Sequence, residues 1–168
     1  MVEMSSATPS RRRLLMLSGI GLLSALSGCT TVDIFGDDSG LAEDKTDAAL
    51  PLTNAVRAGS GLGPLSGDRS AQGAAMVQAK RMARAGTMSH LIGFNDSFLS
   101  RMKSAKVTLP AAENIAVGQE ETERAVHAWV VSQKHLKNML GDYRGLGVAV
   151  ARDPASANRP YWAMVLSS

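Results

Sequence analysis

The chain has 168 residues, of which 45% are apolar, 20% charged and 4% aromatic, and its formal net charge is +3. This length fits one domain with short appendages, and a core with so few aromatic residues must rest on alanine, valine, leucine and methionine. Residues 1–28 hold three arginines and one glutamate, so their removal lowers the net charge to +1. The charge therefore argues against a nucleic-acid partner.

Residues 1–28 are predicted to be a lipoprotein export signal. Arg11–Arg13 are basic, and the apolar run 14–26 that follows is too short to span permanently a hydrocarbon core about 30 Å thick. The run ends in Leu26-Ser27-Gly28-Cys29, which resembles a bacterial lipobox, where the cysteine is acylated. A plain signal peptide and an uncleaved anchor are the alternatives. The arginines also resemble a twin-arginine signal, with an ordinary basic segment as the alternative.

Cys29 is the only cysteine, which excludes an intrachain disulfide and suits lipidation. Acyl chains on Cys29 would bind the membrane stably, because each buried CH₂ contributes about 0.8 kcal/mol. We expect an extracytoplasmic, membrane-anchored lipoprotein that faces the periplasm, in the outer membrane where the cell has one. Residues 29–46 are rich in aspartate and glutamate and are predicted to be a flexible tether. A calcium loop is disfavoured, because the EF-hand glycine and glutamate positions are missing.

Residues 47–168 are predicted to be one monomeric domain that begins with three helices. The first covers residues 48–58, with Asp47 as its cap and with Pro51 tolerated only in the first turn. The second covers residues 69–85, and its small residues at helical spacing predict a buried face that can approach a sheet closely. This face consists of Ala71, Ala74, Ala75, Gln78, Ala79, Met82 and Ala83. The third is short and ends near residue 104.

The second half of the domain is predicted to contain a strand, a helix and a hairpin. The strand covers residues 113–118, and a helix from residue 120 or 121 to 133 follows. His127 lies off the apolar stripe of this helix and is expected at the surface, whereas Ser132 and His135 share a face if the helix continues. Residues 145–151 and 161–166 are predicted to pair as an antiparallel hairpin. The fold class is therefore α+β, with helices covering a small sheet.

Six short motifs follow one another along the domain: Asn54-Ala55-Val56-Arg57, Met88-Ser89-His90, Glu113-Asn114-Ile115-Ala116, Trp129-x-x-Ser132-x-x-His135-x-x-Asn138, Leu146-Gly147-Val148-Ala149 and Tyr161-Trp162. Their order resembles that of the CAP superfamily of cysteine-rich secretory, antigen 5 and pathogenesis-related proteins. Over residues 47–168 the chain resembles the bacterial, disulfide-free branch of this superfamily. The resemblance implies a three-layer α-β-α sandwich around a small central antiparallel sheet.

The resemblance also implies a cleft lined by two histidines and two acids, which in some members holds a divalent metal. By motif, His90 and His135 match the histidines and Glu113 matches one acid, while Ser132 stands at the position of the other. His90, Glu113 and His135 would be a three-ligand set for zinc or another divalent cation, with an open fourth position. The lost acid leaves no obvious group to orient the imidazoles.

Three functions are compatible with these residues. The first is a non-enzymatic envelope module whose groove binds an apolar small molecule, a wall component or a protein. The second is a zinc-dependent hydrolase or peptidase in which His90 and His135 bind the metal and Glu113 is a ligand or general base. In the third, the same three side chains only hold loops together. We expect the first, because a Gly-x-Ser-x-Gly elbow and a His-Glu-x-x-His helix are both missing from the sequence.

Overall fold

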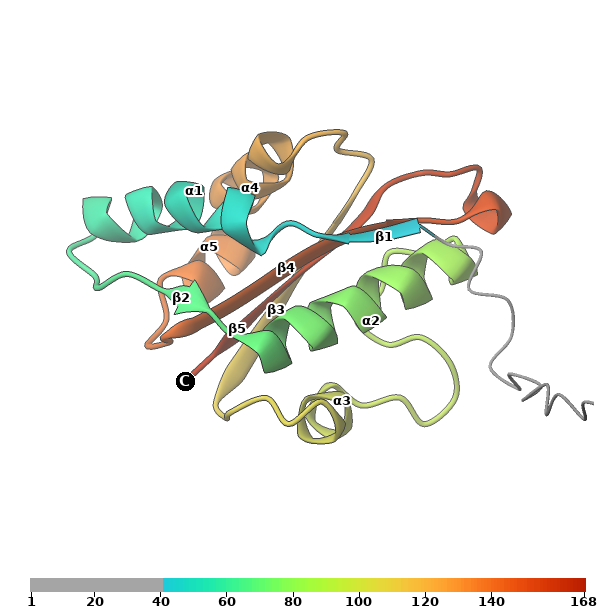
Figure 1. Ribbon diagram of the computed structural model, residues 1–168, viewed down its shortest axis with the longest axis horizontal. Helices are drawn as coiled ribbons and strands as arrows, with labels where there is room; N and C mark the ends of the chain where they lie inside the picture. Colours follow the sequence, from blue (N-terminus) through green and yellow to red (C-terminus); the bar gives the residue numbers. More distant parts are fainter. Residues whose placement is uncertain (1–40) are drawn as a thin grey trace, which may run out of the picture. The chain divides into compact units, whose positions relative to one another are not determined.

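The computed structural model of the chain describes residues 41–168. The export signal, Cys29 and the first part of the predicted tether lie outside the described residues. Within the described part, no helix is both long enough and apolar enough to cross a membrane. The elements in chain order are β1 Leu41–Asp44, α1 Thr46–Gly59, β2 Ser66–Gly67, α2 Arg69–Ala85, α3 Phe98–Ser104, β3 Ala111–Val117, α4 Thr122–Val131, α5 Gln133–Met139, β4 Gly145–Arg152, the 3₁₀ turn η1 Pro154–Ser156 and β5 Tyr161–Ser167 (Figure 1).

The sheet has the strand order β1-β4-β5-β3, and the short β2 pairs with β4 as well. The four strands of the main path are antiparallel to their neighbours, whereas β2 runs parallel to β4. The predicted hairpin is confirmed as β4 and β5, with Val148 opposite Met164. Figure 1 shows α2 and α3 on one face of the sheet and α1, α4 and α5 on the other. The predicted α-β-α sandwich is therefore confirmed.

Each face of the sheet has its own hydrophobic core, because successive residues of a strand point to opposite faces. Leu146, Val148 and Val150 of β4 pack with Trp129 of α4 in the first core. Ala149 and Ala151 of the same strand, with Val165 of β5, pack against α2 in the second core. The strands alternate large apolar residues on one side with smaller ones on the other, and the small-residue side is the one that α2 covers.

The predicted buried face of α2 is confirmed at all seven positions. Asp68 caps the helix by accepting a hydrogen bond from the backbone N–H of Ser70, and Gly86 ends it in the left-handed conformation. Its small residues let the helix backbone touch the sheet. A Cβ added to Gly147 of β4 would lie 2.2 Å from the backbone carbonyl carbon of Ala71.

The first of the six motifs is structural. The side chain of Asn54 exchanges hydrogen bonds with the backbone of Leu65, with N···O distances of 2.8 and 3.0 Å. The guanidinium of Arg57 is buried and donates to the carbonyl oxygens of Met139 and Gly141, at 2.8 and 2.9 Å. These carbonyls lie at the C-terminal end of α5, so Arg57 of α1 fixes where α5 ends.

Several predicted boundaries need correction. Residues 41–44, assigned to the tether, form the strand β1, because their backbone pairs with the outer side of β4. The first helix begins at Thr46 with Lys45 at its cap position, so Asp47 lies in the first turn and does not cap it. Pro51 lies inside this helix rather than in its first turn.

The helix predicted from residue 120 or 121 to 133 is found as α4, but it does not continue to His135. The chain leaves the helical conformation at Ser132 (φ −93°, ψ 112°), so that α4 ends at Val131 and α5 starts at Gln133. Ser132 and His135 therefore do not share the face of one continuous helix. Periodicity did not reveal this break, because the interruption is a single polar residue with ordinary helix-compatible neighbours.

Replacing Gly147 by alanine should destabilise the fold by about 3 kcal/mol, because its Cβ has no room against the α2 backbone. Gly73→Ala on α2 is the matched control, since a Cβ there meets nothing within 4 Å. That change should stabilise the fold by about 0.5–1 kcal/mol. Urea unfolding followed by circular dichroism measures both. Equal stabilities of the two variants would contradict this account of the packing.

Candidate functional site

Glu113 lies in β3, an edge strand of the sheet, and is the buried acid of the site. It pairs in register with Val165 of β5. Because strand residues alternate, Glu113 points to the same side as Ile115, which belongs to the core beneath α2. Only 2% of the Glu113 side chain is exposed. A carboxylate this deeply buried needs partners that stabilise its charge.

Arg101 of α3 supplies the main partner. Its Nη1 donates to Oε2 of Glu113 at 2.8 Å, and its Nη2 donates to Oε1 at 3.0 Å. This is a two-point contact between a guanidinium and a carboxylate, which is stronger and more directional than a single ion pair. The Arg101 side chain is itself 13% exposed. The pair links α3 to the edge strand from the α2 side of the sheet.

His90 is the second partner of Glu113. Its Nδ1 lies 2.9 Å from Oε1 of Glu113, and its side chain is 50% exposed. The carboxylate holds Nδ1 as the protonated nitrogen, which leaves Nε2 available to a ligand. The backbone carbonyl of His90 accepts a hydrogen bond from Nη2 of Arg101 at 2.9 Å. Arg101 therefore positions both the acid and the loop that carries the imidazole.

The ionisation of Glu113 follows from these contacts. Burial alone would raise the pKa of its carboxyl group, but the hydrogen bonds from His90 and Arg101 and the guanidinium charge outweigh burial and hold the pKa below its ordinary value. Glu113 is thus a carboxylate at neutral pH, with both oxygens engaged. It is a weak proton acceptor in this environment.

A second acid, Asp96, ties the His90 loop to both neighbouring helices. Asp96 Oδ2 lies 2.6 Å from Nη2 of Arg81 on α2, and Oδ1 lies 3.4 Å from Nε of Arg101 on α3. The backbone N–H of Ile92 also donates to Asp96 Oδ2, at 2.7 Å. Sequence reasoning missed both Asp96 and Arg101. The available signal was Glu113, because a carboxylate expected in a cleft requires a cationic partner and the six motifs contain none for it.

His135 approaches the site from the opposite face of the sheet. It lies on α5, and its backbone carbonyl accepts a hydrogen bond from Nδ2 of Asn114 at 3.0 Å. Asn138 Nδ2 donates in turn to Oδ1 of Asn114 at 2.8 Å. Asn114 points away from the side that Glu113 occupies, so α5 is fastened to the neighbour of the acid rather than to the acid.

The pKa of His135 is below its ordinary value, first because the imidazole is partly buried and second because His90 places positive charge nearby. Ser132 is half-buried at the break between α4 and α5, and its side chain does not cap α5. His90 and Glu113 are in direct contact, whereas His135 and Ser132 lie in the adjoining layer.

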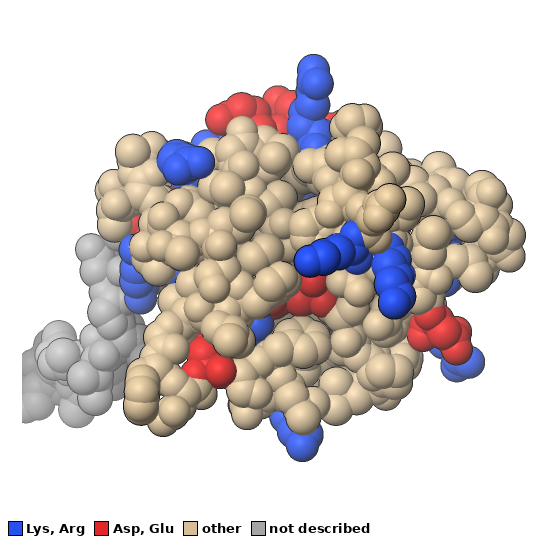
Figure 2. Space-filling model, turned by 180° about the vertical axis from the view of Figure 1, so that it is seen from behind, with Lys and Arg blue, Asp and Glu red and all other residues tan. Residues whose placement is uncertain are grey.

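The free edge of β3 is covered by side chains from α4 and α5. Nε1 of Trp129 donates to the carbonyl of Ile115 at 3.1 Å, and Nδ2 of Asn138 donates to the carbonyl of Glu113 at 3.4 Å. Both residues belong to the Trp129–Asn138 motif. This motif therefore attaches the helices to the edge strand. Figure 2 shows the molecule from behind, with acidic atoms at the bottom of a hollow and basic side chains around it.

The residues do not fit a metal centre. Both oxygens of Glu113 are taken by Arg101 and His90, and among residues 41–168 no three histidine, cysteine, aspartate or glutamate side chains are arranged to hold a metal ion. The predicted set of His90, Glu113 and His135 is therefore not a ligand set in this arrangement. The guanidinium of Arg101 already balances the charge of the carboxylate, as a metal ion would otherwise do.

The family is decided by the sequence match over the same elements. The model of the cysteine-rich secretory protein family, called CAP, matches residues 50–166. The chain belongs to this family. Two Bacillus subtilis proteins are similar in sequence: YkwD is 35% identical over 101 residues, and the membrane protein YlbC is 33% identical over 105 residues. These matches cover 59% and 61% of the chain, but only 39% and 30% of the two relatives, so the chain spans well under half of their length.

Two solved structures share the fold. An extracellular protein with an SCP domain from Bacillus anthracis has a TM-score of 0.63 and 25% identity, over 73% of this chain and 40% of that one. An outer surface protein from Borrelia burgdorferi has a TM-score of 0.65 and 19% identity, over 77% of this chain and 98% of that one. The second likeness is one of fold alone. The CAP domain thus accounts for nearly all described residues.

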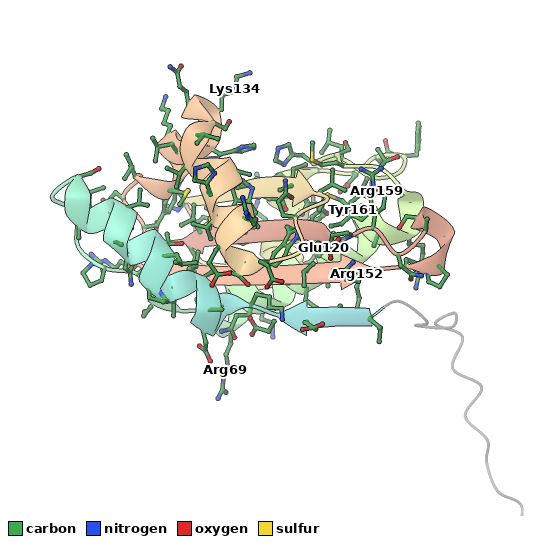
Figure 3. All side chains as sticks on the ribbon, turned by 90° about the horizontal axis from the view of Figure 1, so that it is seen from above. Arg69, Glu120, Lys134, Arg152, Arg159 and Tyr161 are labelled. Atoms are coloured by element: carbon green, nitrogen blue, oxygen red, sulfur yellow. The ribbon has the colours of Figure 1, made fainter. Side chains whose placement is uncertain are left out.

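Arg101→Met should destabilise the protein by about 3 kcal/mol, because it leaves the Glu113 carboxylate buried without its cation. The same change should raise the pKa of Glu113, which a ¹³C NMR titration of the carboxyl group measures. Arg152→Met is the control, since the Arg152–Glu120 pair lies at the surface (Figure 3) and its loss should cost less than about 1 kcal/mol. An unchanged pKa in Arg101→Met would contradict the assigned partnership.

Acidification should destabilise the fold first through His135. Because the pKa of its imidazole in the fold lies below 6.5, the unfolded chain binds this proton first, and stability falls as the pH drops below that value. A second loss, from Glu113, begins below pH 4.5. Unfolding midpoints in urea at successive pH values measure both. His135→Gln should flatten the first loss, and His127→Gln, at an exposed position on α4, should not. Equal slopes in the two variants would contradict this assignment.

Proposed function

We propose that this chain is a membrane-tethered module of the cell envelope that binds an apolar small molecule at the His90–Glu113 site and does not catalyse its conversion. The observation that supports this best is the state of Glu113. Its carboxylate is already neutralised and hydrogen-bonded by Arg101 and His90, so it is poorly suited to accept a proton from water or substrate. The exposed imidazole of His90 remains available for a hydrogen bond to a ligand.

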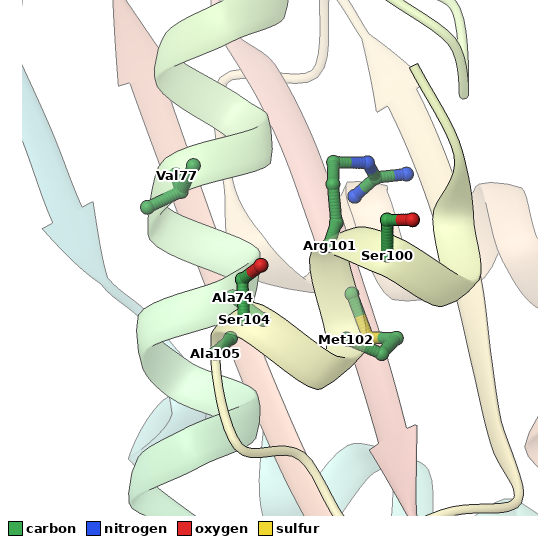
Figure 4. A pocket seen from close by; sticks show the side chains of 7 residues that line it. All are labelled: Ala74, Val77, Ser100, Arg101, Met102, Ser104 and Ala105. Carbon is green, nitrogen blue, oxygen red and sulfur yellow. The ribbon is translucent and has the colours of Figure 1, made fainter. Parts of the chain in front are cut away.

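An apolar cavity beside this site supports a small molecule as the ligand. The cavity lies between α2 and α3, has a volume of about 330 Å³ and is close in size to the smaller ligand pockets of proteins. Its lining is mainly apolar and consists of Ala74, Val77, Ser100, Arg101, Met102, Ser104 and Ala105 (Figure 4). Arg101 belongs both to this cavity and to the Glu113 site. A molecule with an apolar body and one polar group would therefore fit the cavity and the Glu113 site together better than a wholly polar wall fragment.

The envelope location is supported by the relatives and by the sequence before the domain. One similar structure is described as extracellular, another as an outer surface protein, and YlbC as a membrane protein. The lipobox-like segment before Cys29 offers a means of anchoring a domain whose described helices do not cross a membrane. We infer that acylated Cys29 holds the domain outside the cytoplasm.

The same contacts of Glu113 support the two alternative functions less well. A zinc-dependent hydrolase would need Glu113 to exchange Arg101 for a metal ion, at the cost of leaving a guanidinium without its carboxylate partner. A purely structural role accounts for the links that Arg101 makes between α3, the His90 loop and β3. A structural role leaves the half-exposed ring of His90 without a function, and likewise the cavity that Arg101 lines.

Protein purified from membranes of the producing cell should carry an enriched apolar species, detected by mass spectrometry of its organic extract. Val77→Lys should reduce the retained amount several-fold, because it puts a charge at the edge of the cavity. Val131→Lys is the matched control: Val131 is exposed to a similar extent on α4, at the other face of the sheet. Its extract should equal that of the wild type.

Two results would contradict the proposal. An extract without any enriched species in wild type, Val77→Lys and Val131→Lys alike would leave the site with a structural role. Stabilisation of the wild type by one equivalent of zinc, lost in His90→Ala, would favour the metal-dependent alternative.

A further inference from the structure

The loop between α2 and α3 presents an aromatic side chain fully to solvent. Phe94 is 97% exposed, more than any other large apolar residue of residues 41–168. Its two neighbours, Gly93 and Asn95, both have positive φ angles, of 95° and 60°. Asparagine adopts this conformation more readily than most residues, and glycine does so without strain. The loop therefore turns sharply on both sides of Phe94.

This exposed position is held by ion pairs. Asp96 accepts a hydrogen bond from the backbone N–H of Ile92 and pairs with Arg81, and Arg81 also donates to the carbonyl of Ile92. Ile92 and Asp96, the ends of the five-residue turn around Phe94, are thereby tied to each other and to α2. An unconstrained loop could fold its phenylalanine back onto the protein, but this one is fastened with the ring outward.

Two other exposed apolar residues lie in the same loop as Phe94. Met88 and Leu91 are 49% and 56% exposed, so three of the large apolar residues exposed in the described part lie within seven positions. We call Met88, Leu91 and Phe94 the apolar loop. Single exposed apolar residues are common on soluble proteins, but three within one loop, one of them in a turn held by ion pairs, are typical of a contact surface.

The sequence on both sides of the apolar loop is mainly basic. Residues 80–103 include five basic residues, Lys80, Arg81, Arg84, Arg101 and Lys103, and one acid, Asp96. Asp96 is already paired with Arg81 and Arg101. The exposed positive charges, those of Arg84 and Lys103 among them, complement an anionic surface.

The first residues of the domain lie at the end of the molecule that also holds the loop after α2. Leu41, the first residue of β1, pairs with Arg152 at the end of β4, and Gly86 at the end of α2 lies against Ser156 just beyond that strand. Figure 1 shows the start of β1, the end of α2 and the loop after it at one end of the molecule. Cys29 precedes Leu41 by 12 residues, which reach roughly 40 Å at most when fully extended.

We propose that the apolar loop inserts into the headgroup–acyl boundary of an anionic membrane, with the basic residues around it contacting lipid headgroups. A bilayer is favoured over a protein partner because the predicted anchor would hold this end of the domain within reach of the membrane. His90 lies in the same loop, so insertion would place the candidate site at the membrane surface and let an amphiphile enter it from the bilayer. The inference rests on the tether of the proposed function.

Fluorescence of the full chain, produced with its export signal and reconstituted into vesicles, tests this proposal. In Phe94→Trp, the added tryptophan should emit at shorter wavelength and lose most of its own fluorescence when the vesicles contain lipids with brominated acyl chains. Val131→Trp is the matched control, because it carries the same anchor and its position is also exposed. The native Trp129 and Trp162 are buried and add the same background to both variants. The loss should be larger in anionic than in zwitterionic vesicles and smaller at high salt.

The outcomes separate docking from tethering. If both variants stay on the vesicles and Phe94→Trp is quenched no more than Val131→Trp, docking is overturned and the tether is not. If both variants remain in solution, the tether and the docking fail together. A blue-shifted Phe94→Trp emission without quenching would mean that protein, including a second copy of the chain, covers the loop, and this also overturns the proposal.

Discussion

The ion pair between Glu113 and Arg101 is the constraint on which the site depends. A carboxylate with 2% exposure persists in the fold only because a guanidinium meets it at two points and an imidazole at a third. The same arginine binds the backbone of His90 and lies beside Asp96, so one side chain joins α3, the long loop and the edge strand. These contacts stabilise the site and restrict the chemistry open to its acid.

The sheet explains why the four residues predicted to line the cleft, His90, Glu113, Ser132 and His135, divide into two groups. Neighbouring residues on β3 face opposite layers, so Glu113 meets the α2 side while Asn114 meets α5. His90 lies on the α2 side of the sheet, and His135 lies on α5 on the other side. Burial and, second, the charge of His90 lower the pKa of His135. A ligand at this edge would therefore touch two layers that the sheet otherwise keeps apart.

Much of this architecture could be predicted from the sequence, because periodicity and motif order reflect packing directly. The small-residue face of α2 and the β4–β5 hairpin are examples, since both depend on residues near in sequence. Arg101 and Asp96 could not be found in this way, because their roles depend on which elements meet in space. The strand β1 was missed because its backbone pairs with the distant β4, and the break at Ser132 was missed because a single polar residue among helix-compatible neighbours leaves the periodicity unchanged.

The side chains of Trp129 and Asn138 that occupy the outer carbonyls of β3 have a wider consequence. An edge strand with free backbone groups is a template on which another polypeptide can add a strand, and crowding on a two-dimensional surface would promote such polymerisation. Here two of the outward acceptors are already occupied by indole and amide donors. A domain concentrated on a bilayer would thereby be protected against growing into fibrils along its own sheet.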